Sequence, residues 1–131
     1  NGCIGGLVAI TAEPLMPSPL AAILIGAIGG IIVVYGTKLL LSMKIDDVVG
    51  AIPAHLFAGI WGTLAVPITN PDTSFGTQLL GVISINAFVF IVAFIVWAIM
   101  KNTFGIRLSK EGELKGTDVT ETGVIAYAIR D

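Results

Sequence analysis

Long uncharged stretches dominate the chain. Three of them contain no Asp, Glu, Lys or Arg and run for 24, 24 and 28 residues. They lie between Glu13 and Lys38, between Asp47 and Asp72, and between Asp72 and Lys101. A helix needs about 20 apolar residues to cross the roughly 30 Å hydrocarbon core of a bilayer. The pattern therefore predicts three membrane-spanning helices and an all-α membrane protein.

The breaks in this pattern set the expected boundaries. We expect a transmembrane region over residues 1–101, with a partial helix at 1–12 and spans at about 20–41, 48–66 and 78–100. A proline-rich connection at 13–19 and a loop of turn residues at 67–76 separate them. Because residues 1–12 are too few to span, we interpret them as the end of a helix that begins upstream, and the chain as a C-terminal fragment. Residues 102–131 form a polar tail.

Composition and charge support this interpretation. The chain is 55% hydrophobic and 12% charged, with a mean hydropathy of +0.94, whereas soluble domains carry about 25% charged residues. The net charge of −2 gives no indication of nucleic-acid binding. Lysine and arginine occur in the 38–47 connection and in the tail but not in the 67–76 loop. The positive-inside rule therefore predicts a cytoplasmic C-terminus.

The one histidine, His55, lies inside the second predicted span. An ionisable group at membrane depth is expensive and is a functional candidate by default, and imidazole exchanges protons near neutral pH. Two interpretations stay open at this point: a packed histidine between helices, or a group on a transport path. No second ligand at metal spacing and no nucleophile partner accompany it, and Cys3 is a single cysteine. We therefore expect no metal, no cofactor and no enzymatic activity.

Small residues recur every four positions on two of the predicted spans, which lets a neighbouring helix approach closely. They are Ala22, Gly26 and Gly30 on the first span and Gly50, Ala54, Ala58 and Gly62 on the second. His55, Gly59 and Thr63 follow the adjacent face of the second span. That face predicts either an open lumen or a close helix contact.

The start of the second span carries two acidic residues and a proline. Asp46 or Asp47 is expected to cap the helix and to complement its positive end. Pro53 would kink a helix that begins near Asp47, but it is tolerated in the first turn of a helix that begins later. Three further side chains allow two interpretations each. Asn86 is expected to bond a neighbouring helix rather than a solute, and Trp61 and Trp97 are either interfacial anchors or packing residues.

Several blocks of sequence occur in a recognisable order along the whole chain. They are residues 1–12, Lys44 to Asp47, Gly50 to His55, Gly59 to Leu64, Phe75-Gly76, Gln78 to Gly81, Gly105 to Leu108, Gly116 to Asp118, and Ala126-Tyr127. Together they resemble the ammonium transporter (Amt/Mep/Rh) family, from the end of its eighth helix through its eleventh and into its cytosolic tail.

The resemblance implies the C-terminal part of an eleven-helix membrane fold that assembles as a homotrimer with one pore per subunit. It implies passage of ammonium or ammonia through an apolar pore, with deprotonation of ammonium. His55 matches the second member of the family's twin-histidine pair, and its partner would lie upstream. Asp46, Asp47, Gly59 and Thr63 would lie near the pore. The implied location is the inner membrane of a prokaryotic cell, in contact with the lipid bilayer.

The tail departs from the family pattern. Thr122 and Val124 stand where the family often has histidine and glutamate. This difference counts against binding of a PII-type regulator at the cytosolic face. Three alternatives to transport remain open: an ammonium sensor on the same fold, a Rh-like gas channel, and a fragment that does not conduct.

Overall fold

The computed structural model describes residues 1–15 and 17–126, and every regular element within those ranges is a helix. The elements are α1 (Gly2–Ile10), α2 (Pro19–Ser42), the π-helical η1 (Ile52–Phe57), α3 (Ala58–Thr69), α4 (Phe75–Thr103), α5 (Lys110–Lys115) and the π-helical η2 (Asp118–Thr122). Among the described residues, three helical stretches are long and apolar enough to cross a membrane: Pro19–Ser42, Ile52–Thr69 and Phe75–Thr103. The predicted all-α membrane class is confirmed.

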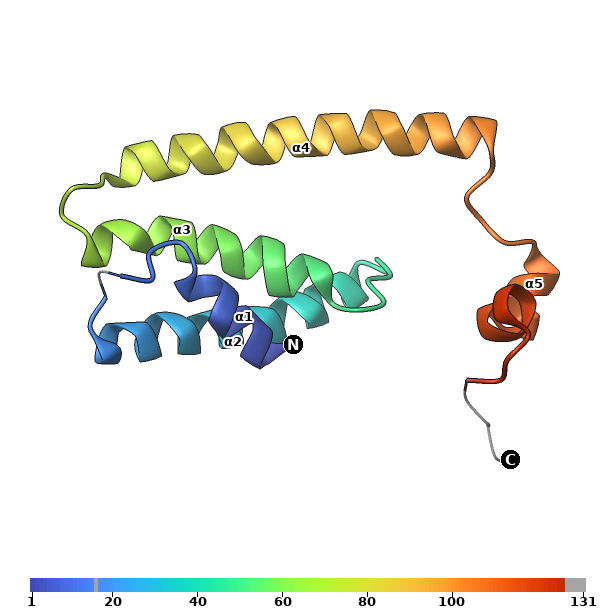
Figure 1. Ribbon diagram of the computed structural model, residues 1–131, viewed down its shortest axis with the longest axis horizontal. Helices are drawn as coiled ribbons and strands as arrows, with labels where there is room; N and C mark the ends of the chain where they lie inside the picture. Colours follow the sequence, from blue (N-terminus) through green and yellow to red (C-terminus); the bar gives the residue numbers. More distant parts are fainter. Residues whose placement is uncertain (16, 127–131) are drawn as a thin grey trace. The chain divides into compact units, whose positions relative to one another are not determined.

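Contacts divide the chain into two units, Asn1–Ala87 and Phe88–Asp131. In the first unit, α1, α2 and the continuous helix made by η1 and α3 pack against one another (Figure 1). In the second unit, the tail forms α5 and η2, where Thr120 Oγ1 donates to the carbonyl oxygens of Gly116 and Gly112 at 2.8 and 3.3 Å. The sequence pattern had indicated only a polar extension here.

Helix α1 approaches α2 closely enough at several glycines for backbone atoms to meet. A Cβ atom built on Gly29 would lie 2.8 Å from the carbonyl oxygen of Gly5, and one built on Gly26 would lie 3.4 Å from that of Gly6. A Cβ on Gly30 would lie 3.3 Å from the carbonyl oxygen of Gly2. The expected contact at Gly26 and Gly30 is therefore present. Close backbone approach is how membrane helices gain packing where lipid offers no hydrophobic drive.

The small-residue stripe on the second predicted span is buried, as expected. Gly50, Ala54, Ala58 and Gly62 all have little exposed surface. Ala54 and Ala58 form a buried cluster with Val33 of α2, and a Cβ on Gly62 would overlap the carbonyl group of Ala9 in α1. The stripe therefore holds this helix against both α1 and α2.

The first turn of η1 satisfies its backbone N–H groups in an ordered way. The carboxylate of Asp47 accepts from the N–H groups of Ala51 and Ile52 at 2.9 and 2.7 Å. Pro53 has no N–H group to satisfy, and the next N–H group, that of Ala54, donates to the carbonyl oxygen of Gly50 at 3.1 Å. The helix thus begins late enough for proline to be tolerated in its first turn. Asp47, not Asp46, is the cap.

A second contact fixes the turn before this helix. Because Pro53 lacks an N–H group, the carbonyl oxygen of Val49 is left available, and the side-chain amide of Asn1 donates to it at 3.0 Å. Gly50 adopts a left-handed φ of 73° beside the same asparagine. The start of α1 is therefore tied to the entry of η1.

The helix ends differ from those expected for residues 48–66. It starts at Ile52 because the Asp47 cap and the left-handed Gly50 precede it, and it continues to Thr69 with Pro67 inside it. Pro67 had been assigned to the following loop. Proline is tolerated inside membrane helices because local adjustments satisfy the freed carbonyl group.

We expect Gly62→Val to reduce the amount of folded protein in the membrane. The added side chain would overlap the Ala9 carbonyl group, and overpacking of this kind costs about 1–3 kcal/mol. The matched control is Gly76→Val, because in the described part of the chain a Cβ at Gly76 would meet no atom within 4 Å apart from its chain neighbours and the nearby backbone of its own helix. Yield and thermal unfolding in detergent measure the difference. Equal behaviour of the two variants would contradict the close contact.

We expect Asp47→Ala to lower the stability of the folded protein by about 1 kcal/mol, the usual cost of losing a helix cap. Asp47→Asn should fall between Asp47→Ala and the wild type in stability, because its amide oxygen can accept one of the two N–H bonds but its NH2 group cannot accept the other. Asp46→Ala, at an exposed position, serves as the control. Thermal unfolding of the full-length protein tests the order of the three variants. A larger loss of stability for Asp46→Ala than for Asp47→Ala would contradict the assignment of Asp47 as the cap.

Candidate functional site

His55 lies on η1 and lines an open cavity of about 300 Å³. Its side chain is exposed in the described structure, and Gly59 and Thr63 line the same cavity from α3. His55 therefore borders open space within the described residues. Leu56 and Ile60 complete this wall of the cavity.

The opposite wall belongs to the first part of α4, within the first unit. It consists of Gln78, Gly81, Val82, Ile85 and Asn86, which lie on one face of the helix because three and four residues make about one turn. Gln78 had not been singled out from the sequence. Its spacing of eight residues from Asn86 could have indicated that the two amides share a face.

The polar groups around the cavity differ in how they are satisfied. The side-chain amide of Asn86 donates to the carbonyl oxygen of Val82 in its own helix at 2.7 Å. The expected bond from Asn86 to a neighbouring helix is therefore not present in the described part of the chain. No side-chain hydrogen bond of His55, Thr63 or Gln78 occurs within the described ranges. These groups are available to a ligand or to another segment.

A glycine gives the helix room beside His55. A Cβ on Gly59 would lie 3.7 Å from Val8 Cγ1 of α1, which is ordinary contact. Gly59 thus faces both α1 and the cavity. Thr63, one turn further, adds a hydroxyl group to the same wall.

The π-helical turn places His55 off the α-helical register. The N–H group of Ala58 bonds to the carbonyl oxygen of Pro53, five residues earlier, as well as to that of His55. Short π-helical turns within α-helices occur often at functional sites. The wider turn changes which face His55 presents relative to the buried residues that follow it.

The two acidic residues at the entry, Asp46 and Asp47, lie away from the cavity. Neither Asp46 nor Asp47 lines it. Asp47 is held by its two backbone bonds at the start of η1, and Asp46 is exposed. Asp47 thus caps the helix that carries His55 without facing the cavity.

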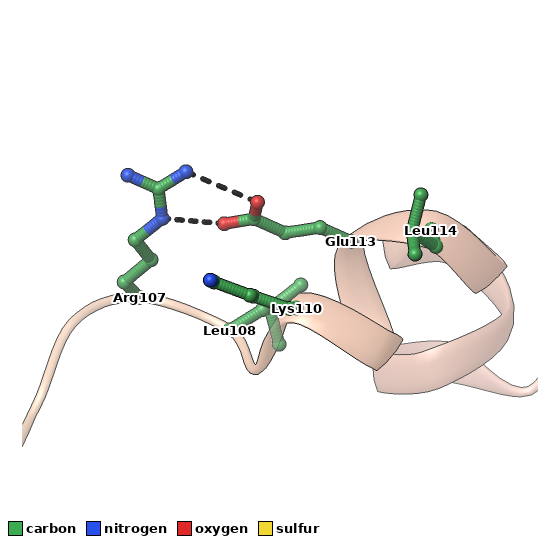
Figure 2. A pocket seen from close by; sticks show the side chains of 5 residues that line it. All are labelled: Arg107, Leu108, Lys110, Glu113 and Leu114. Atoms are coloured by element: carbon green, nitrogen blue, oxygen red, sulfur yellow. Dashed lines mark hydrogen bonds and ion pairs between the residues drawn. The ribbon is translucent and has the colours of Figure 1, made fainter.

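The tail contains another pocket with different chemistry. Figure 2 shows Arg107 forming a two-point ion pair with Glu113, with Nε–Oε1 and Nη2–Oε2 distances of 2.5 and 3.0 Å. The hydrogen bonds from Arg107 hold the pKa of Glu113 below its ordinary value. Leu108, Lys110 and Leu114 complete the pocket. The pair closes the tail on itself and leaves both side chains accessible.

The two tail residues that differ from the family pattern, Thr122 and Val124, make no hydrogen bond or buried contact beyond the tail within the described residues. Thr122 bonds through its hydroxyl group to the carbonyl oxygen of Asp118, and Val124 is exposed. The N–H group of Ala126 donates to the Asp118 carboxylate at 2.7 Å, which lowers the pKa of Asp118. Tyr127, the last residue of the expected tail motif, lies outside the described residues.

Comparison with known proteins agrees with this architecture. The model of the Ammonium Transporter Family matches residues 1–127. The chain is 37% identical to the ammonium transporter Amt2 of Archaeoglobus fulgidus and 36% identical to Amt1 of Haloferax mediterranei. It is 32% identical to the ammonium transporter of Bacillus subtilis.

These alignments cover the chain but only part of the relatives. Each includes 97% of this chain, against 31% of the Archaeoglobus protein, 26% of the Haloferax protein and 35% of the Bacillus protein. The chain is thus similar to one section of longer proteins, and the family is one of transporters rather than enzymes. With its three apolar helices and a match over nearly its full length, the chain belongs to the ammonium transporter family.

Proposed function

We propose that the protein containing this chain transports ammonium or ammonia across a membrane, and that His55 lines the path. The observation that supports this most strongly is the exposed imidazole on a membrane helix, facing a cavity of about 300 Å³ with Gly59 and Thr63 beside it. An ionisable group in a bilayer almost always faces the interior or a cavity when it has a function. The names of the relatives support the choice of solute.

The physical chemistry favours transfer of the neutral molecule. An unpaired ammonium ion in an apolar lumen costs far more free energy than neutral ammonia. Loss of a proton at entry therefore lowers the barrier. Potassium cannot lose a proton, so the same lumen excludes it. In this mechanism a neutral imidazole accepts a hydrogen bond from ammonia at one ring nitrogen and donates from the other.

The partner of His55 would come from the upstream part of the protein. In the described structure, one wall of the cavity carries His55 and Thr63 and the other carries Gln78 and Asn86. A second histidine that enters this cavity could share a proton with His55, since imidazole titrates near neutral pH. The family resemblance supports such a twin-histidine pair, with Gly59 and Thr63 shaping the wall and Asp47 holding its entry.

Assembly and location follow from the same proposal. We infer a homotrimer in the cell membrane of a prokaryote, with the tail on the cytoplasmic side and a role in nitrogen uptake. This orientation is supported by Lys38 and Lys44 before η1 and by the lysines and arginines of the tail. The α5–η2 tail is then the surface open to a PII-type regulator, although Thr122 and Val124 depart from the family pattern.

In the full-length protein, we expect His55→Ala to reduce ammonium flux at least about tenfold or to abolish its selectivity over potassium, because a proton-exchanging group on the path is lost. The protein should still assemble, since His55 is not part of the buried packing face. Currents or pH changes in proteoliposomes measure the flux.

The matched control for that measurement is Thr37→Val. Thr37 is also a polar residue in a membrane helix, but its hydroxyl group bonds the carbonyl oxygen of Val33 in its own helix at 2.9 Å. Thr37→Val should keep wild-type flux. Wild-type flux and selectivity in His55→Ala would refute the assignment of His55.

A further inference from the structure

We propose that Trp61 is a positioning residue for His55, acting through a hydrogen bond to the backbone of α2. The inference rests on the proposed role of His55 and adds a residue to it. Trp61 does not line the cavity and would not touch the solute. Its role would be to fix how the helix that carries His55 is rotated.

The bond joins two membrane helices that are far apart in sequence. Trp61 Nε1 donates to the carbonyl oxygen of Ile25 at 3.0 Å. The indole also packs against the buried cluster of Ala9, Ile25 and Ala65. The side chain thus contacts α1 and α2 together. Of its two possible roles, interfacial anchor or packing residue, the structure supports packing.

The helix needs a directional contact because its buried face is smooth. Ala54, Ala58 and Gly62 have methyl groups or hydrogen atoms at the contact, and such a surface brings helices close without strongly fixing their rotation. A bulky indole with a single N–H donor fits one orientation. Hydrogen bonds depend steeply on angle, so a rotated helix would lose the bond to Ile25.

Rotation of this helix would move His55. Trp61 follows the imidazole by six residues in one continuous helix, with His55 inside the π-helical turn η1 and Trp61 in α3. The Asp47 cap holds the start of the helix, and Trp61 holds its body against α2. Together these two contacts fix the rotation of the helix and therefore the direction in which the imidazole of His55 points. Without the second contact, a larger share of the molecules would turn the imidazole away from the cavity.

The test compares three variants of the full-length protein in proteoliposomes: Trp61→Phe, Trp97→Phe and His55→Ala. Phenylalanine keeps an aromatic ring at position 61 but removes the N–H donor. We expect Trp61→Phe to lower maximal flux about fivefold, the factor that corresponds to one net hydrogen bond, and to move the pH at half-maximal rate. Trp97→Phe, at an exposed position on α4, should retain the wild-type rate and pH profile.

A purely structural tryptophan predicts a different result. In that case flux would fall only in proportion to the amount of folded protein, and the pH profile would stay at its wild-type position. That outcome, or wild-type flux in Trp61→Phe while His55→Ala is impaired, would overturn the inference and leave the proposed function intact. Wild-type flux in His55→Ala would instead refute the proposed function.

Trp61→Phe also shortens the side chain and could lower the yield. A further variant at the same position therefore replaces Trp61 with benzothienylalanine, which keeps the size of the bicyclic ring and replaces N–H by sulfur. We expect this variant to assemble as the wild type does and to show the same fall in maximal flux and the same shift in pH profile. A wild-type profile in the sulfur analogue would overturn the inference.

Discussion

The close backbone contact of α1 with its two neighbours is the constraint on which the first unit depends. Gly5 and Gly6 meet Gly29 and Gly26 of α2, and the carbonyl group of Ala9 lies against Gly62 of α3. In a bilayer, apolar side chains gain little by leaving lipid, so helices associate through short-range packing. Helix α1 therefore contacts both α2 and α3 closely, because the glycines at these contacts let the backbones approach.

The direction of the face that carries His55 follows from that packing. Because the stripe from Ala54 to Gly62 must face α1 and α2, the adjacent face with His55, Gly59 and Thr63 is turned toward the cavity. The entry of the helix is fixed in parallel by the Asp47 carboxylate and by the Asn1 amide on Val49. Pro53 fits the Asp47 cap because it has no N–H group that needs an acceptor. It also fits the Asn1 contact, because it leaves the carbonyl oxygen of Val49 free for the Asn1 amide. Packing, capping and the placement of the histidine thus agree with one another.

Much of this fold could be predicted from the chain. Charge-free runs mark the membrane helices, and the four-residue spacing of Gly50, Ala54, Ala58 and Gly62 indicates the buried face because helix geometry repeats nearly every four residues. Other features depend on three-dimensional contacts that no local pattern encodes. The π-helical turn around His55, the bond from Trp61 to Ile25 and the extension of α3 through Pro67 belong to this group.

One wall of the candidate site could be predicted from the sequence, and the other could not. Residue type and membrane depth single out His55, and its spacing groups it with Gly59 and Thr63. The second wall, from Gln78 to Asn86, could not be assigned, because the pairing of two helices depends on the loop between them. The choice between Asp46 and Asp47 also needed the direction of two N–H groups.

The measurement that tests the account most directly is an experimental structure of the full-length protein in lipid, at a resolution that shows the His55 imidazole. The account predicts a ring that faces a narrow apolar lumen, with a nitrogen of a second histidine at a hydrogen-bond distance of about 3 Å. An imidazole that faces lipid, or one enclosed in a dry helix contact without a second histidine, would contradict it.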